Sequence, residues 1–198
     1  WTLSFLTFFM SAALDNLTYD SNDDYHGSDT LSIAVDDLAN GGPGALTDSH
    51  DIALTVDPVN ETPVITKPST QTVNEDNNLT ISGLSISEPH DVNAESGTTT
   101  SNIEVKATLS VDHGVIHLTQ TTGLTFHDDT TDDTATMSFT GSLAAVNAAI
   151  DDLVYDSNSD YFGSDTLTVT INDLSNGDAA EDAIEVTDTI AITVDPIN

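Results

Sequence analysis

An acidic loop at 155–167, YDSNSDYFGSDTL, carries the first residues whose spacing suggests metal chemistry. Asp156, Asn158 and Asp160 alternate with other residues, as the first ligands of an EF-hand calcium loop do. That loop also needs glycine at its sixth position and glutamate at its twelfth, where this sequence has tyrosine and leucine. An EF-hand is therefore excluded. We expect a tight corner turned at Gly163, with a weakly bound cation as the alternative.

The same loop occurs earlier in the chain and reveals a repeat. YDSNDDYHGSDTL at 19–31 is identical to the later loop at 11 of 13 positions. It places the alternating oxygens on Asp20, Asn22 and Asp24. Residues 14–40 align without a gap on 150–176, and IALTVDPVN at 52–60 matches IAITVDPIN at 190–198, which gives a period of about 138 residues.

The charge excludes several classes of function. Among 198 residues there are 34 acidic side chains, two lysines and no arginine, for a formal net charge of -32. Two lysines cannot supply the cationic patch that nucleic acids or anionic lipids require. A bound cation would neutralise part of this charge; a solvated acidic surface is the alternative. The absence of cysteine excludes disulfides and thiolate metal sites.

The repeat also predicts the domain boundaries. Residues 61–198 form one complete repeat, and 1–60 correspond to the C-terminal part of the repeat before it. The apolar opening WTLSFLTFFMSAAL is too short to span ~30 Å of hydrocarbon and predicts a core strand and a short helix of a domain that begins upstream. Either the sequence is an excerpt from a longer array, or a strand from another molecule completes the half-domain.

Short strands dominate the expected secondary structure. In DTLTVTIND, Leu167, Val169 and Ile171 alternate with polar residues, which is typical of a strand with one buried face. Similar segments, among them NLTISGLSI at 78–86, predict about nine strands per repeat. One helix is expected at 141–153, where apolar residues fall at helical spacing and Ser142 can cap the N-terminus. The pattern predicts an all-β sandwich with one short helix per repeat.

Several segments together resemble a known family. They are VNEDNNLTISGLSIS, TTGLTFHDD, ATMSFTGSLAAVNAAIDDLVYDSNSDYFGSDTLTVTIND and the closing ITVDPIN. In combination they resemble the cadherin-like and immunoglobulin-like tandem repeats of giant bacterial surface proteins and adhesins. The resemblance implies extracellular Greek-key β-sandwiches in tandem, stiffened by calcium between domains and in some cases associated with carbohydrate binding.

The resemblance places calcium at the junction VDPVNETPV. The cadherin linker pattern falls on Asp57, Asn60 and Glu61, with threonine in place of the second asparagine. Calcium takes six to eight oxygens from carboxylates, amides and carbonyls, which suits three such side chains in five residues. Further ligands are expected from adjoining loops: Glu75, Asp91, Asn93 and Asp37. The alternative is a polar linker in which these residues only form turns.

These observations favour a structural role over catalysis. The sequence has no nucleophile elbow, phosphate loop or defined pair of catalytic carboxylates, so we do not expect an enzyme. We expect a calcium-stabilised structural or adhesive module of a large secreted surface protein, with neighbouring repeats as partners. The alternatives are a subunit of an extracellular filament completed by strand exchange between identical molecules, and a carbohydrate-binding module. A single tryptophan, Trp1, disfavours the last.

Overall fold

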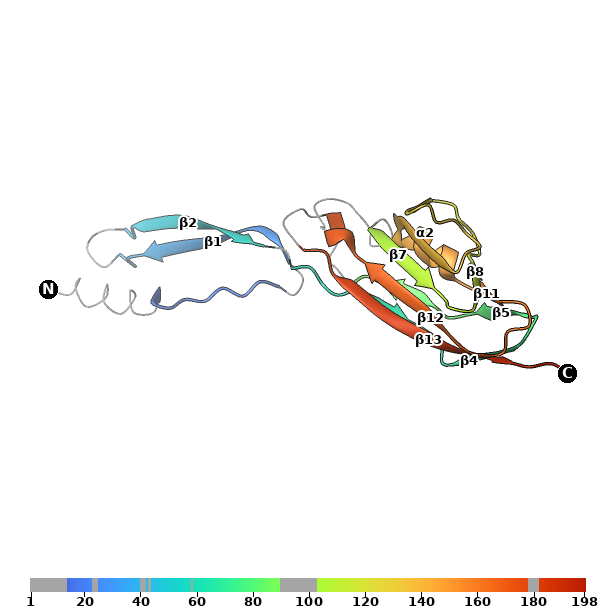
Figure 1. Ribbon diagram of the computed structural model, residues 1–198. Helices are drawn as coiled ribbons and strands as arrows, with labels where there is room; N and C mark the ends of the chain where they lie inside the picture. Colours follow the sequence, from blue (N-terminus) through green and yellow to red (C-terminus); the bar gives the residue numbers. More distant parts are fainter. Residues whose placement is uncertain are drawn as a thin grey trace. The chain divides into compact units, whose positions relative to one another are not determined.

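The structure is a computed structural model that describes residues 14–22, 25–39, 42, 44–57, 59–89, 103–177 and 182–198. It divides into two compact parts, unit 1 (Trp1–Pro58) and unit 2 (Val59–Asn198), which are described separately below (Figure 1). The division falls just before the expected boundary at 60/61, so Asn60 and Glu61 both belong to unit 2.

In its described residues, unit 2 consists of strands and one α-helix. Its elements are β3 (Val64–Thr66), β4 (Gln71–Asn74), β5 (Asn78–Ile81), β6 (Ser85–Ser87), β7 (Glu104–Ser110), β8 (Gly114–His117), β9 (Leu124–Phe126), β10 (Thr136–Ser142), α2 (Leu143–Ile150), β11 (Leu153–Ser157), β12 (Gly163–Asn172), the 3₁₀ turn η2 (Leu174–Gly177) and β13 (Glu185–Asp195). Six strands form one sheet in the order β4-β13-β12-β7-β10-β9. A second sheet has the order β5-β11-β8, and β3 pairs with β6.

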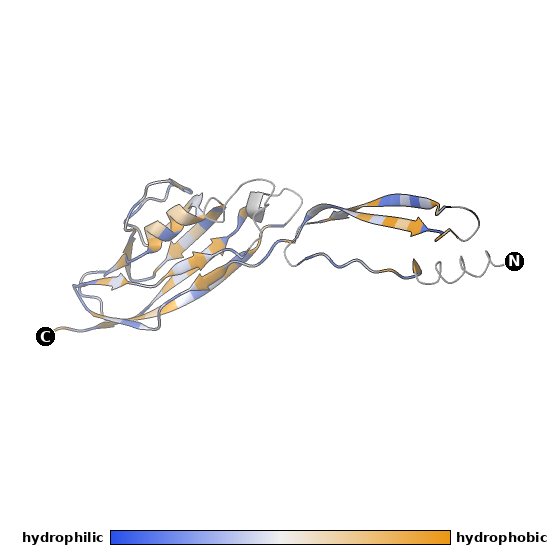
Figure 2. Cartoon of the chain, turned by 180° about the vertical axis from the view of Figure 1, so that it is seen from behind, coloured by the Kyte–Doolittle hydropathy of each residue, from blue (hydrophilic) through white to orange (hydrophobic). Residues whose placement is uncertain are grey.

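The two larger sheets enclose one core. Strand hydropathy alternates, as expected for strands with one face in a core (Figure 2). From the six-stranded sheet, Leu109 and Phe139 are fully buried; from the three-stranded sheet, Ile81, Ile116 and Tyr155 are equally buried in the same cluster. This confirms the predicted β-rich, sandwich-like architecture. The Greek-key connectivity and the cadherin-like assignment stay predictions.

Helix α2 confirms the predicted short helix. The Ser142 side chain accepts a hydrogen bond from Ala145 N at 3.2 Å and so caps the N-terminus. Leu143, Val146 and Ile150 face the core. No helix in the described residues is long and apolar enough to cross a membrane.

The strands differ from the prediction in number. The described residues of unit 2 contain eleven strands, from β3 to β13, instead of about nine. The predicted strand NLTISGLSI is divided into β5 and β6, because Gly83 between them turns the backbone at φ 81°. Strand β4 is only four residues long and Val73 is its one apolar residue, so the sequence pattern did not reveal it, although its burial alternates along the strand.

Unit 1 contains one hairpin, made of β1 (Gly27–Asp36) and β2 (Thr47–Val56). Its pairing runs from Gly27↔Val56 to Asp36↔Thr47. The pairing of β12 with β13 runs from Gly163↔Val194 to Asn172↔Glu185, the positions that correspond in the sequence repeat. The two hairpins therefore share one register, which the alternating pattern and the common corner loop fix.

Gly114 tests the contact between β8 and β11. A Cβ at this position would lie 2.4 Å from the Asp156 carbonyl oxygen and 2.6 Å from the Tyr155 ring. We expect Gly114→Ala to lower the free energy of unfolding of unit 2 by about 3 kcal/mol, because a backbone carbonyl and a buried ring cannot move aside. Thermal and urea unfolding followed by circular dichroism measures the change.

Gly42→Ala is the matched control. Gly42 is exposed in a loop of unit 1, with nothing within 4 Å of an added Cβ. This variant should stay within ~0.5 kcal/mol of the parent. Equal stability of the Gly114→Ala variant and the parent would contradict the described packing of β8 on β11.

Candidate functional site

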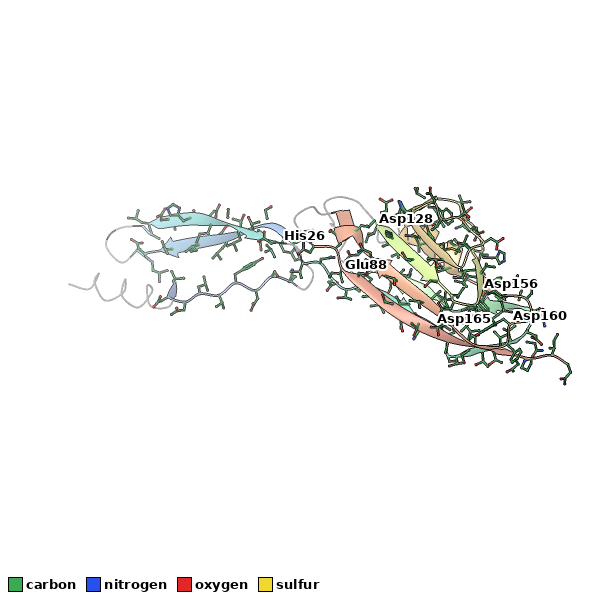
Figure 3. The ribbon with its side chains drawn as sticks, viewed as in Figure 1. His26, Glu88, Asp128, Asp156, Asp160 and Asp165 are labelled. Atoms are coloured by element: carbon green, nitrogen blue, oxygen red, sulfur yellow. The ribbon has the colours of Figure 1, made fainter. Side chains whose placement is uncertain are left out.

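The repeated acidic loop is organised by the buried carboxylate of Asp165, which is 4% exposed at the start of β12 (Figure 3). Asp165 accepts hydrogen bonds from Tyr155 Oη at 2.8 Å, Thr166 N at 2.7 Å, Asp112 N at 3.1 Å and His113 N at 3.0 Å. The donors come from β11, from β12 and from the turn between β7 and β8. One carboxylate thus joins both sheets, and we call this arrangement the corner.

The electrostatics of the corner follow from these contacts. Burial works to raise the pKa of Asp165, but the Tyr155 hydroxyl and three backbone N–H groups together hold that pKa below its ordinary value. Burial, reinforced by the hydrogen bond to Asp165, raises the pKa of Tyr155 above its ordinary range. The carboxylate is therefore charged and the phenol neutral at physiological pH.

Aromatic rings close the outer side of the corner. His113 stacks on Tyr161 with ring centroids 4.2 Å apart and an interplanar angle of 10°. Tyr161 Oη donates to the Ser164 carbonyl at 2.6 Å, across Gly163 at φ 138°. His113 Nδ1 also lies 3.8 Å from Asp165 Oδ1. The loop thus folds as the tight corner that its sequence predicts.

Unit 1 contains a second, partial corner. Tyr19 Oη donates to Asp29 Oδ2 at 2.7 Å, and Thr30 N donates to Asp29 Oδ1 at 2.7 Å. The hydrogen bond to Asp29 raises the pKa of Tyr19 to about 12. Within the described residues of unit 1, no turn corresponds to the one that brings Asp112 N and His113 N to Asp165.

The loop residues with alternating oxygens are tied to neighbouring segments through their backbone N–H groups. In unit 2, Asp160 N donates to Asp76 Oδ1 at 3.3 Å and Asn158 N donates to the His113 carbonyl at 2.8 Å. Asp156 and Asp160 lie toward the end of unit 2 from which the C-terminus leaves (Figure 3). In unit 1, Asp20 and Asn22 are exposed, and Asp24 lies outside the described residues.

Asn60, a predicted calcium ligand, belongs to a different part of unit 2. Its Nδ2 donates to Asp173 Oδ2 at 2.8 Å and to the Asp182 carbonyl at 2.9 Å, beside the end of β12. Asp173 is fully buried and also accepts from Ser175 N and Ile184 N. Asn60 therefore ties the start of unit 2 to the turn region between β12 and β13.

Glu75, another predicted ligand, lies at the opposite end of unit 2. Its Oε1 accepts from Ile197 N at 2.7 Å, and its backbone N donates to the Asp195 carbonyl at 2.8 Å. Strand β13 runs between these two ends, which places them on the order of 30 Å apart. The structure therefore does not bring Glu75 to the same point as Asn60.

The remaining predicted calcium ligands belong to both units, and each is described within its own unit. Glu61 is partly buried in unit 2, and Asp57 is exposed in unit 1. Asp37, also in unit 1, accepts from Ala39 N at 2.9 Å and Leu46 N at 2.8 Å. Asp91 and Asn93 lie outside the described residues. Within the described residues, no group of three or more His, Asp or Glu side chains is arranged to hold a metal ion, and calcium binding stays a prediction.

The role of Asp165 in the corner and the turn-holding role of Asp37 and Asp173 were not identified from the sequence, although the repeat carries a signal for them. Tyr155 and Asp165 recur as Tyr19 and Asp29, and Asp173 recurs as Asp37 at an identical offset. Asp37 and Asp173 accept two backbone N–H groups at corresponding positions in their hairpins. These identities mark residues that hold the hairpin ends.

Comparison with known proteins gives only distant structural similarity. No protein-family description matches, and no curated protein matches. Among solved structures, AggA, the major subunit of aggregative adherence fimbriae type I from Escherichia coli, is 15% identical with a TM-score of 0.37, over 70% of this chain and 99% of AggA. A PapD-like domain of human CEP192 is 7% identical with a TM-score of 0.33, over 73% of this chain and 96% of that domain. At TM-scores this low, these similarities assign neither a family nor a function.

Asp165→Asn tests the corner. An amide in place of the carboxylate directs an NH₂ group at N–H donors, so we expect unit 2 to lose about 3 kcal/mol of unfolding free energy at pH 7. Because the folded-state pKa of Asp165 is depressed, its stabilisation is complete above the unfolded pKa and is lost as pH falls through the folded one. The gap between parent and variant should therefore narrow below pH ~4.

Chemical unfolding at several pH values measures this gap. Asp160→Asn, at an exposed position of the loop between β11 and β12, is the control and should change stability by less than ~0.5 kcal/mol. A gap between parent and Asp165→Asn that stays constant from pH 7 to acid would contradict the assignment of a charged carboxylate to the corner.

Proposed function

We propose that this protein is a structural and adhesive module of an extracellular surface protein or filament, built from repeats that are joined in series. The observation that carries the proposal is the position of Asn60. This residue ends the first copy of the closing motif VDPVN, yet its side chain is hydrogen-bonded within the body of unit 2. The closing motif of one repeat is thus a structural part of the next.

The short length of the junction supports a role in transmitting force or setting the spacing between repeats. Strand β2 ends at Val56, and Asn60 is already anchored to Asp173, so only Asp57, Pro58 and Val59 separate them. Proline further restricts this segment, because its ring fixes φ. A short, restricted connection of this kind suits a repeat that transmits force or sets spacing better than it suits an independently moving binding domain.

The chemistry of the described residues also suits a structural role. The polar groups that are buried, such as Asp165 and Asp173, accept hydrogen bonds from the backbone and hold turns. In proteins such carboxylates stabilise local structure when their oxygens are satisfied by hydrogen-bond donors. The high negative charge keeps repeats soluble and separated, and fits a cation-rich extracellular medium.

Calcium stabilisation remains part of the proposal. With two lysines against 34 acidic residues, bound divalent cations are the available means of reducing repulsion between carboxylates. The acidic end of unit 2, where Glu75 and Asp195 meet and where Asp76 accepts from Asp160 N, supplies carboxylate and carbonyl oxygens. Its counterpart at the first junction includes Asp57.

Asn60→Ala tests the junction. Loss of both hydrogen bonds removes one donor from the buried Asp173 carboxylate, so we expect the unfolding free energy of unit 2 to fall by about 2 kcal/mol. Asn60→Asp should be more destabilising at pH 7, because it places a second carboxylate against the first. Thermal unfolding measures both variants.

Val59→Ala is the control for the junction, because Val59 is 77% exposed and immediately precedes Asn60. It should remain within ~0.5 kcal/mol of the parent. If Asn60→Ala were as stable as Val59→Ala, the closing motif would be a passive linker and the proposed function would lose its support.

Calcium should raise the melting temperature of the chain. An ion present at 100 times its dissociation constant adds roughly 2.7 kcal/mol to the free energy of unfolding. Scanning calorimetry with excess calcium, with magnesium at the same ionic strength, and with chelator measures the effect and separates specific binding from screening. Superimposed curves for calcium and chelator would remove calcium from the proposal.

A further inference from the structure

The hairpin of unit 1 presents an exposed apolar face. The equivalent face of the β12–β13 hairpin is buried in the core of unit 2. The exposed face consists of Leu31, Ile33, Val35, Ile52, Leu54 and Val56. Val35 is 40% exposed and Ile52 is 46% exposed, and the others are partly exposed. Their counterparts Leu167, Val169, Ile171, Ile190, Ile192 and Val194 are between 0% and 2% exposed. The same apolar pattern therefore has a cover in one copy and an open face in the other.

The edges of the two hairpins differ in the same way. In unit 2, β12 pairs on its outer side with β7, antiparallel, and β13 pairs with β4, parallel. In unit 1, β1 and β2 form a two-stranded sheet in the described residues. Each edge of the unit 1 hairpin thus offers backbone groups in the arrangement that β7 and β4 bind in unit 2.

The partial corner of unit 1 indicates which segment would complete the hydrogen bonding of Asp29. Asp165 receives two backbone hydrogen bonds from the turn between β7 and β8, whereas its counterpart Asp29 receives Tyr19 and Thr30 alone among the described donors. A charged carboxylate with free acceptor positions favours N–H donors in that place. A turn equivalent to Asp112–His113 would supply them.

Charge at the strand edge favours the same segment. In unit 2, Lys106 of β7 is the register partner of Asn172 at the end of β12. The counterpart of Asn172 in unit 1 is Asp36. A β7-like strand that carries this lysine would therefore meet an opposite charge across the strand pair, which is a stabilising arrangement.

We propose that the β1–β2 hairpin is an acceptor for a segment of a further repeat of the same kind, equivalent to residues 61–134, which pairs with both edges and covers the apolar face. This inference rests on the proposed function, because it assumes that the repeats act in series. It identifies the partner of unit 1 by its chemistry: a β4-like strand, a β7-like strand with lysine at its start, and a β7–β8 turn.

A second copy of this chain does not satisfy both hairpins. The described residues contain two equivalent hairpins, β1–β2 and β12–β13, and one covering segment, which unit 2 already uses. Exchange of this segment between two copies would leave one of the two hairpins open in each. An additional repeat segment would cover the unit 1 hairpin without uncovering β12–β13.

The test adds that segment to the full chain. Residues 1–5, WTLSF, match ATMSF at 135–139, so residues 61–134 placed directly ahead of Trp1 continue into the sequence counterpart of β10. Hydrogen exchange followed by mass spectrometry compares the parent and this fusion. We expect amides of β1 and β2 to exchange rapidly in the parent and ~100-fold or more slowly in the fusion, at the level of β12 and β13.

Matched substitutions distinguish cover from misfolding. Ile33→Ser should leave the amide exchange rates of the β1–β2 hairpin unchanged in the parent but restore rapid amide exchange of β1 in the fusion. Val169→Ser, at the equivalent position of β12, should cause rapid amide exchange of β12 in both proteins. Rapid exchange of β1 and β2 in a fusion whose β12 and β13 remain protected would overturn the proposal. Slow amide exchange of the β1–β2 hairpin in the parent would also overturn the proposal. If that protection increased with protein concentration, a second copy of the chain would be the cover. Neither result involves the Asn60 junction or calcium, which test the proposed function separately.

Discussion

The need to cover one face of a hairpin governs the architecture of unit 2. The six aliphatic side chains of β12 and β13 are almost completely buried, and burying each such side chain contributes ~1.5–3 kcal/mol. A two-stranded hairpin alone is only marginally stable in water. The remaining elements serve this requirement: β4 and β7 extend the hairpin at its edges, and the sheet β5-β11-β8 closes the core over it. The hairpin is thus the invariant part of the repeat, present in the same register in both units.

The corner carboxylate links this hairpin to its cover. Asp165 lies at the start of β12 and is bound by groups from β11 and from the β7–β8 turn, so the two sheets cannot separate without exposing a buried charge or breaking its hydrogen bonds. A buried carboxylate in such a position is stabilising only when its oxygens accept hydrogen bonds from enough donors. The acidic loop therefore contributes a structural carboxylate to the fold. The negative charge of Asp165 is bound by N–H and O–H donors.

The sequence predicts local and repeated features well and long-range convergence poorly. Alternation predicted the paired strands, and helical spacing with Ser142 predicted α2, because both depend on neighbours in the chain. The corner depends on residues about fifty positions apart, Asp165 and the pair Asp112–His113, which no local pattern connects. The expected calcium ligands Asn60 and Glu75 were grouped because the resemblance to the cadherin linker places both at one junction, yet β13 separates the ends of unit 2 at which they lie. Spacing along the chain does not reveal the end of a sheet at which a loop lies.

The two copies of the closing motif make different contacts within unit 2. In the second copy, VDPIN, Ile197 N donates to Glu75 and so ties the motif to the repeat it ends. In the first copy, VDPVN, Asn60 donates to Asp173 and so ties the motif to the repeat it precedes. Because the two motifs occupy corresponding positions, a repeat within a series would make both sets of contacts through one five-residue segment. The stability of each repeat would then depend on the residue that ends the one before it. Coupling between nearest neighbours of this kind makes a linear array more resistant to local opening than its separate repeats are.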